Sequence, residues 1–183
     1  MFTPFPTLET GRLILRQPAD TDAADLFEMR SDPEVMKYIP RPLAKTPDDM
    51  MPFLKMLSDR LAEGTGINWA IELKDTGKVV GLIGYVNMDP DHQRAEVGYS
   101  LTRSFHRRGI VSEAIKAVIR YGFEGPMKLH SIEAIVDADN IPSAKLLERV
   151  GFVKEAHFRE DFLHNGQFRN SVHYGLLQSD VSW

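Results

Sequence analysis

Residues 103–113, Arg-Ser-Phe-His-Arg-Arg-Gly-Ile-Val-Ser-Glu, join a predicted strand to a predicted helix through a basic loop. The strand ends at Leu101, and Gly109 opens an amphipathic helix that runs to about Phe123. The first N–H groups of a helix have no partner in the helix and lie at the positive end of its dipole, so they favour anions. A glycine lets the backbone approach a phosphate closely, and Arg103, Arg107 and Arg108 add positive charge. The stretch therefore predicts either a phosphate site or a solvated basic loop that begins a surface helix.

Two common nucleotide motifs are absent from the sequence. It contains neither Gly-x-x-x-x-Gly-Lys-Ser/Thr nor Gly-x-Gly-x-x-Gly. A phosphate site in this loop would thus be neither a Walker loop nor a dinucleotide-binding turn.

Residue spacing on both sides of the loop predicts a mixed α/β sheet. Period-two alternation and turn residues predict strands, and apolar residues at helical spacing predict helices. Strands are expected at 12–16, 67–73, 79–88, 94–101, 131–137, 152–161 and 169–177. Helices are expected at 20–30, 47–62, 109–123 and 141–150, and residues 34–47 form an irregular connection.

Length and composition indicate one globular domain spanning residues 1–183. At ~150 residues per domain the chain holds one, and 43% hydrophobic and 26% charged residues are ordinary for a globular protein. Because the sequence has no cysteine, disulfide bonds and a cysteine thiolate nucleophile are excluded. A net charge of −4 and a pI near 5.9 argue against direct nucleic-acid binding. The N-terminus lacks the pattern of a secretory signal, and the longest apolar run, Val79–Val86, is too short to span a membrane, so we expect a cytoplasmic protein.

A second informative stretch is residues 140–152, Asn-Ile-Pro-Ser-Ala-Lys-Leu-Leu-Glu-Arg-Val-Gly-Phe. Asn140 is a good residue to cap a helix start, and Gly151 is a good residue to end one. Capping explains both of these residues, but it does not predict Ser143.

Together the two stretches resemble the Gcn5-related N-acetyltransferase (GNAT) family. The family's Gln/Arg-x-x-Gly-x-Gly/Ala loop corresponds to residues 106–111, where His106 and Val111 depart from the pattern. Its Asn-x-x-Ser…Gly-Phe element matches residues 140–152. Further similar stretches at 9–16, 95–99 and 165–177 look like the RimJ/RimL-type ribosomal-protein acetyltransferases, so the resemblance covers nearly the whole chain.

The resemblance implies a fold and a co-substrate. The expected fold is a mostly antiparallel twisted sheet with a splayed strand pair, flanked by about four helices. The co-substrate is acetyl-CoA, without a metal. The implied CoA-binding residues are Tyr99, Ser100, Leu101, Arg103, His106, Arg107, Arg108, Gly109, Ile110, Val111, Ser112, Asn140 and Ser143. A bulge in the splayed strand would expose backbone groups to the pantetheine arm and offer N–H groups to a developing oxyanion.

Glu96 is the expected general base. Strand alternation places Glu96, Gly98 and Ser100 on one side, while Ala95 and Val97 face the other. Ala95 and Val97 suit a core, and Glu96, Gly98 and Ser100 suit a reaction site. The pattern also fits a Glu96 carboxylate that simply faces solvent. A carboxylate that acts through water needs to give only a modest rate gain, because the ordinary pKa of an α-amine is about 7.7–8.0.

Ser143 is the expected hydrogen-bond donor to the leaving thiolate, and water is the alternative. Many GNAT enzymes carry a tyrosine four residues after the serine, and Leu147 occupies that position here. The RimL-like pattern assigns the task to the serine.

The acceptor is expected to be a primary amine, most readily a protein N-terminal α-amine. Tyr38 and Trp69 are the expected acceptor-binding residues, with ordinary core packing as the alternative for both. A small amine acceptor (aminoglycoside, polyamine or amino acid) and a CoA-binding module without turnover are the other hypotheses. The histidines show no metal-ligand spacing. We expect a monomer or homodimer that binds no membrane.

Overall fold

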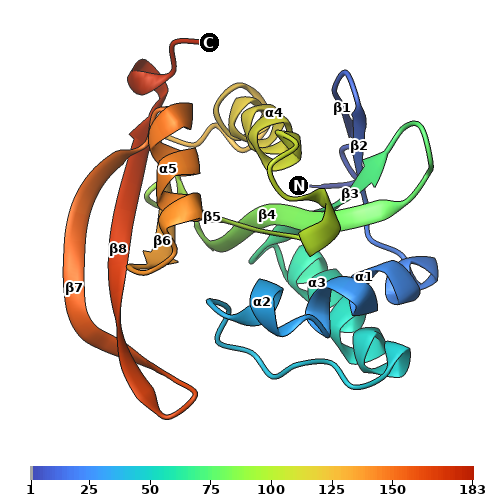
Figure 1. The fold of residues 1–183 in the computed structure, drawn as a ribbon. Helices are drawn as coiled ribbons and strands as arrows, with labels where there is room; N and C mark the ends of the chain where they lie inside the picture. Colours follow the sequence, from blue (N-terminus) through green and yellow to red (C-terminus); the bar gives the residue numbers. More distant parts are fainter. Residues whose placement is uncertain (1) are drawn as a thin grey trace.

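The computed structural model describes residues 2–183 and has an eight-stranded sheet at its centre (Figure 1). The order across the sheet is β1-β2-β3-β4-β5-β6-β8-β7. All neighbouring pairs are antiparallel except β5 and β6. The strands are β1 (Leu8–Glu9), β2 (Leu13–Arg16), β3 (Ile67–Leu73), β4 (Val79–Asp89), β5 (Arg94–Leu101), β6 (Ser131–Asp137), β7 (Val153–His164) and β8 (Gln167–Leu177).

Helices cover both faces of the sheet. In Figure 1, α4 lies on one face, while α1, α2 and α3 lie on the other. The α-helices are α1 (Ala23–Arg30), α2 (Pro33–Met36), α3 (Met50–Glu63), α4 (Ile110–Glu124) and α5 (Ile141–Val150). Short 3₁₀ turns occupy Asp20–Asp22, Pro47–Asp49, Arg103–Phe105 and Gln178–Asp180. Among the described residues, no helix has the length and apolar character needed to cross a membrane.

The central strands contribute to two cores because both of their faces are covered. Along β3, Trp69 and Ile71 face the core built with α4 and α5, whereas Ala70 faces the core built with α1 and α3. Residues 79–86 of β4 form a continuous apolar run because this part of the strand is buried on both faces and has no position that faces solvent. The sheet is thus held rigidly between two layers, and β5 lies within it.

The predicted fold class is confirmed, and most predicted elements match within a few residues. Strands 67–73, 94–101 and 131–137 and helix 141–150 have the predicted bounds. Two elements were not predicted. β1 is only two residues long, and α2 is a single turn that begins at Pro33, where the Asp32 carboxylate accepts the Glu34 N–H. Elements this short carry too few residues to show a period.

Candidate active site

The strands β5 and β6 pair over three residues and then separate. Their parallel register runs from Arg94–Ser131 to Glu96–Glu133 and stops there. On its other side, β5 stays paired with β4 as far as Leu101. The edge of β5 over residues 97–101 that faces β6 therefore has backbone groups without a strand partner. We call this region the strand opening, and it is the splay that the resemblance to the GNAT family implies.

Glu96 lies where the strand opening begins. Its carboxylate Oε2 accepts a 2.7 Å hydrogen bond from Asn87 Nδ2. Asn87 has a positive φ of 49° and lies in a bulge of β4, between the Val86–Glu96 and Asp89–Arg94 pairs. The resemblance implies a bulge in the splayed strand itself. The structure has it in the neighbouring strand, where it turns an amide toward the carboxylate.

Several groups set the electrostatics of Glu96. Burial raises the pKa of its carboxyl, the Asn87 hydrogen bond lowers that pKa, Glu133 raises it and His173 lowers it, with a net rise above the ordinary value of 4.5. Glu133 is the residue that β6 places opposite Glu96, and it is bound by Arg94. A carboxyl with a raised pKa is a better proton acceptor than an ordinary glutamate.

The alternation predicted for β5 is confirmed. Ala95 and Val97 are buried in the core with α4, while Glu96, Gly98 and Ser100 lie on the opposite face and are partly exposed. A Cβ built on Gly98 meets no heavy atom within 4 Å, so there is open space directly beside Glu96 on this face. An acceptor amine reaching Glu96 would have room there.

Tyr99 and Ser143 meet on the other face of β5. The Tyr99 hydroxyl and Ser143 Oγ are 2.7 Å apart, and either can be the donor. Burial raises the pKa of Tyr99 to about 12, although its hydrogen bond to Ser143 lowers it. The phenol is therefore protonated at neutral pH and able to donate to Ser143. The sequence placed both residues in the site but did not pair them, because they lie 44 positions apart.

The start of α5 holds Ser143 in place. Asn140 caps the helix, with its side-chain oxygen accepting the Ser143 N–H at 3.3 Å, and Gly151 ends it with a φ of 114°. Both capping predictions are confirmed. Leu147, the position of the tyrosine in many family members, is completely buried. Tyr99 brings a phenol to this region from the sheet instead.

The basic loop before α4 has the backbone geometry of an anion site. Arg107 and Gly109 both have positive φ, 61° and 75°. Such alternation of backbone conformation turns successive N–H groups toward one point. In the described chain, no backbone oxygen accepts the N–H groups of residues 107–112. These free donors, beside three arginines and a helix start, suit a diphosphate.

His106, which departs from the family pattern, has a structural contact. Its Nε2 lies 2.9 Å from the Leu101 carbonyl oxygen, so the ring folds back onto the end of β5. The guanidinium of Arg108 lies over the Phe105 ring, 5.1 Å from its centroid. His106 thus contacts the end of β5 through its side chain, and its part in the phosphate cradle stays a prediction.

The two predicted acceptor-binding residues have different environments. Trp69 is completely buried, packs against Phe5, Tyr85 and Tyr121, and donates its indole N–H to the Pro6 carbonyl at 2.7 Å. It points into the core with α4 and is removed from the site, because β3 alternation directs position 69 away from the face of Glu96. Tyr38 is partly exposed and stays a candidate.

Tyr38 lies near the β7–β8 hairpin. Arg169 of β8 binds Asp137 and Asp139, and its pKa is raised by the bond to Asp137 and by the nearby Tyr38. The connection after α2 thus approaches Arg169 of the hairpin.

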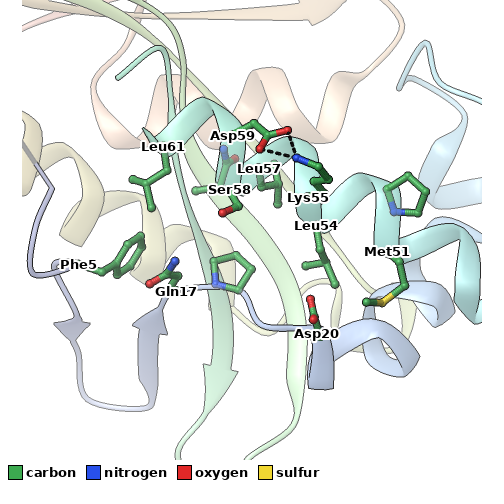
Figure 2. Close-up of a pocket in the computed structure, with 13 residues that line it drawn as sticks. Phe5, Gln17, Asp20, Met51, Leu54, Lys55, Leu57, Ser58, Asp59 and Leu61 are labelled. Carbon is green, nitrogen blue, oxygen red and sulfur yellow. Dashed lines mark hydrogen bonds and ion pairs between the residues drawn. The ribbon is translucent and has the colours of Figure 1, made fainter. Parts of the chain in front are cut away.

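An open cavity of about 640 Å³ lies elsewhere, between α3 and the turn at residues 17–20 (Figure 2). Leu54, Leu57 and Leu61 give it an apolar wall, and Lys55 and Asp59, which form an ion pair on α3, also line it. Its lining includes none of the sequence-predicted site residues. Within residues 2–183, no cluster of three or more histidine or acidic side chains has the arrangement of a metal site.

The chain has clear relatives. The family model of the acetyltransferase (GNAT) domain matches residues 12–153. The uncharacterized N-acetyltransferase YoaA of Bacillus subtilis is 38% identical over 174 residues, which cover 95% of this chain and 98% of that protein. The crystal structure of a GNAT acetyltransferase from Bacillus anthracis superposes with a TM-score of 0.84 at 27% identity, covering 95% of this chain and 99% of that one.

Two further relatives from Escherichia coli (strain K12) have names that state an acceptor. The [ribosomal protein uS5]-alanine N-acetyltransferase is 26% identical over 181 residues, covering 94% of this chain and 91% of that protein. The spermidine N(1)-acetyltransferase is 28% identical over 102 residues, covering 56% of this chain and 54% of that protein. The family match over residues 12–153 and the likeness to YoaA show that this chain belongs to the GNAT family of N-acetyltransferases, which use acetyl-CoA.

Proposed function

We propose that this protein acetylates the N-terminal α-amine of a protein, with Glu96 as base and Ser143 as hydrogen-bond donor to the thiolate. One observation carries the proposal. The strand opening starts at Glu96, and it has the Glu96 carboxylate on one face and the Tyr99–Ser143 pair on the other. A thioester held in that opening would have a base on its acceptor side and a hydroxyl on its sulfur side.

The residues present suit each part of acetyl-CoA. The free N–H groups of residues 107–112 would bind the diphosphate, and the unpaired edge of β5 at 99–101 would pair with the pantetheine amides. When bound, acetyl-CoA supplies an activated acetyl group. Arg103 of the basic loop and Asn140 at the start of α5 are assigned to CoA binding as well.

The proton balance assigns a task to each catalytic group. The amine nitrogen forms a bond to the acetyl carbon, the carbon–sulfur bond breaks, and Glu96 takes a proton from the amine through water. Ser143, itself bonded to Tyr99, donates a hydrogen bond to the departing sulfur. Hydrogen bonding is enough for this leaving group, since a thiol has a pKa of about 8.5.

The paired acidic side chains on and just after β6 favour an acceptor with a single amine over a polyamine. Glu133 is already paired with Arg94, and Arg169 binds both Asp137 and Asp139. These acids are therefore largely neutralised, and a polycation gains little from them. The relative named for a ribosomal-protein acceptor also aligns over nearly the whole chain, whereas the spermidine enzyme aligns over about half.

The test is an acetyl-CoA turnover screen that follows thiol release. The acceptors are peptides with the N-terminal sequences of ribosomal proteins, the same peptides with blocked α-amines, and a panel of polyamines, aminoglycosides and amino acids. We expect release with free peptides only, and mass spectrometry should place the acetyl group on the α-nitrogen. Faster turnover of a small amine than of any peptide would replace the protein acceptor with a small molecule. CoA binding without release for any acceptor would indicate a non-catalytic module.

A further inference from the structure

The turn between β1 and β2 is joined to the first turn of α4, about 100 residues away in the sequence. The carboxylate of Glu113 accepts hydrogen bonds from the Thr10 hydroxyl at 2.6 Å, the Arg12 N–H at 2.9 Å and Arg12 Nε at 2.7 Å. Arg12 Nη1 then donates to the Arg108 carbonyl at 3.0 Å. These residues, Thr10, Arg12 and Glu113, form what we call the hairpin clamp.

The Arg108 carbonyl is the informative contact. Arg108 lies between Arg107 and Gly109, the two residues with positive φ. An arginine in the left-handed region is strained, so the loop needs an external contact to hold that shape before any ligand arrives. Arg12 supplies a contact at the middle of the turn, and its Nη2 lies 3.5 Å from the place that a Cβ on Gly109 would occupy.

Glu113 is otherwise hard to explain at this position. A carboxylate in the first turn of α4 suits the helix dipole but repels a phosphate bound at the same helix start. Burial raises the pKa of Glu113, yet the bonds from Thr10 and Arg12 outweigh burial and lower that pKa below its ordinary value. The carboxylate is thus ionised, and it is used to fix a guanidinium that remains 54% exposed beside the loop.

We propose that Arg12 is a positioning residue of the CoA site and that Glu113 and Thr10 hold it there. Arg12 fixes the Arg107–Gly109 turn so that the backbone N–H groups of the turn are directed outward. Its guanidinium also places a positive charge beside the bound diphosphate. The inference rests on the proposed assignment of this loop to the CoA diphosphate.

The experiment measures the Kd for CoA and for pantetheine, which lacks the diphosphate, by calorimetry. We expect Arg12→Ala to weaken CoA binding tenfold or more and to leave pantetheine binding within twofold. The KM for acetyl-CoA should rise, and kcat at saturation should stay within twofold. Lys55→Ala is the matched control, because it also removes a cation from an ion pair but lies on α3, and it should leave both affinities unchanged.

Glu113→Gln separates positioning from simple charge. If only electrostatics matter, removing a negative charge beside a phosphate site tightens CoA binding. If the hairpin clamp matters, its loss weakens CoA binding, and we expect the Kd for CoA to rise threefold or more. Arg12→Lys keeps the charge but loses the forked contacts, so we expect at most partial rescue.

Three results would overturn the inference: CoA affinity of Arg12→Ala within twofold of wild type, tighter binding by Glu113→Gln, or full rescue by Arg12→Lys. If Arg12→Ala does not fold, Thr10→Val removes one bond of the clamp and should weaken CoA binding by a smaller factor, and no change would count against the clamp. A Gly109→Ala variant with normal CoA affinity would instead show that the loop is not the diphosphate site.

Discussion

Replacing Gly109 with alanine tests the anion site most directly. Gly109 has a φ of 75°, and a Cβ built there meets one atom within 4 Å, Arg12 Nη2 at 3.5 Å. That distance is an ordinary contact, so the protein itself leaves room for the methyl group. The backbone conformation still costs an alanine about 1–2 kcal/mol. For a chain of this size, the loss corresponds to a fall in Tm of roughly 2–8 °C.

Gly166 supplies the matched control. It has a φ of 76° in the β7–β8 turn, and a Cβ there meets nothing within 4 Å. Gly109→Ala and Gly166→Ala should therefore lose similar stability for the same backbone reason. They should differ in binding, because only the methyl on residue 109 stands among the free N–H groups of the loop.

The assay is CoA titration by calorimetry beside thermal unfolding of each variant. A hydrogen bond from an N–H to a charged group contributes about 1.5–3 kcal/mol, so loss of one should weaken CoA binding tenfold or more. Gly166→Ala should bind CoA as wild type does. If both variants lose stability equally and Gly109→Ala still binds CoA within twofold of wild type, the loop does not hold the diphosphate and the reasoning fails.

Four other predictions concern the strand opening. Glu96→Gln should lower kcat mainly below pH 8, and an unchanged pH–rate profile would rule out the base role. Because the folded-state pKa of Glu96 is raised, its contribution to stability is complete only below about pH 4.5 and is lost as the pH rises through the folded-state pKa. The variant should therefore also have a higher Tm than wild type at pH 7. Ser143→Ala should lower kcat tenfold or more, and an effect under twofold would remove Ser143 from the mechanism. Tyr99→Phe should lower kcat by a smaller factor, with little change in the KM for acetyl-CoA. Gly98→Val should raise the KM for the acceptor several-fold in steady-state assays while Tm changes little, and a normal KM would show that the acceptor does not use the space beside Glu96.

Local patterns in the chain were sufficient to predict most of the fold. The apolar spacing of residues 109–123, the caps at Asn140 and Gly151 and the alternation along 94–101 each act within a few residues, so they can be read directly. The elements that were missed, β1 and α2, are too short for any period to show.

The candidate site was predictable only in part. Glu96 and Ser143 came from strand alternation and a family motif, and the structure brings them to the two faces of one strand opening. Trp69 was expected to bind the acceptor, with core packing as the alternative, and the register of β3 directs it into the core. Asn87 gave no signal, because its role depends on a bulge that one strand alone cannot reveal.

Most of the elements, the caps of α5 and the glycine that starts α4 could be predicted from the chain alone, since these depend on neighbouring residues and backbone preferences. The contacts between distant groups became visible only in the folded protein: Tyr99 with Ser143, Asn87 with Glu96, and Arg12 with Glu113 and the Arg108 carbonyl. The physical reason is that strand register and helix docking are set by burial over the whole sheet. A hydrogen bond between residues 9 to 101 positions apart exists only after that packing is complete.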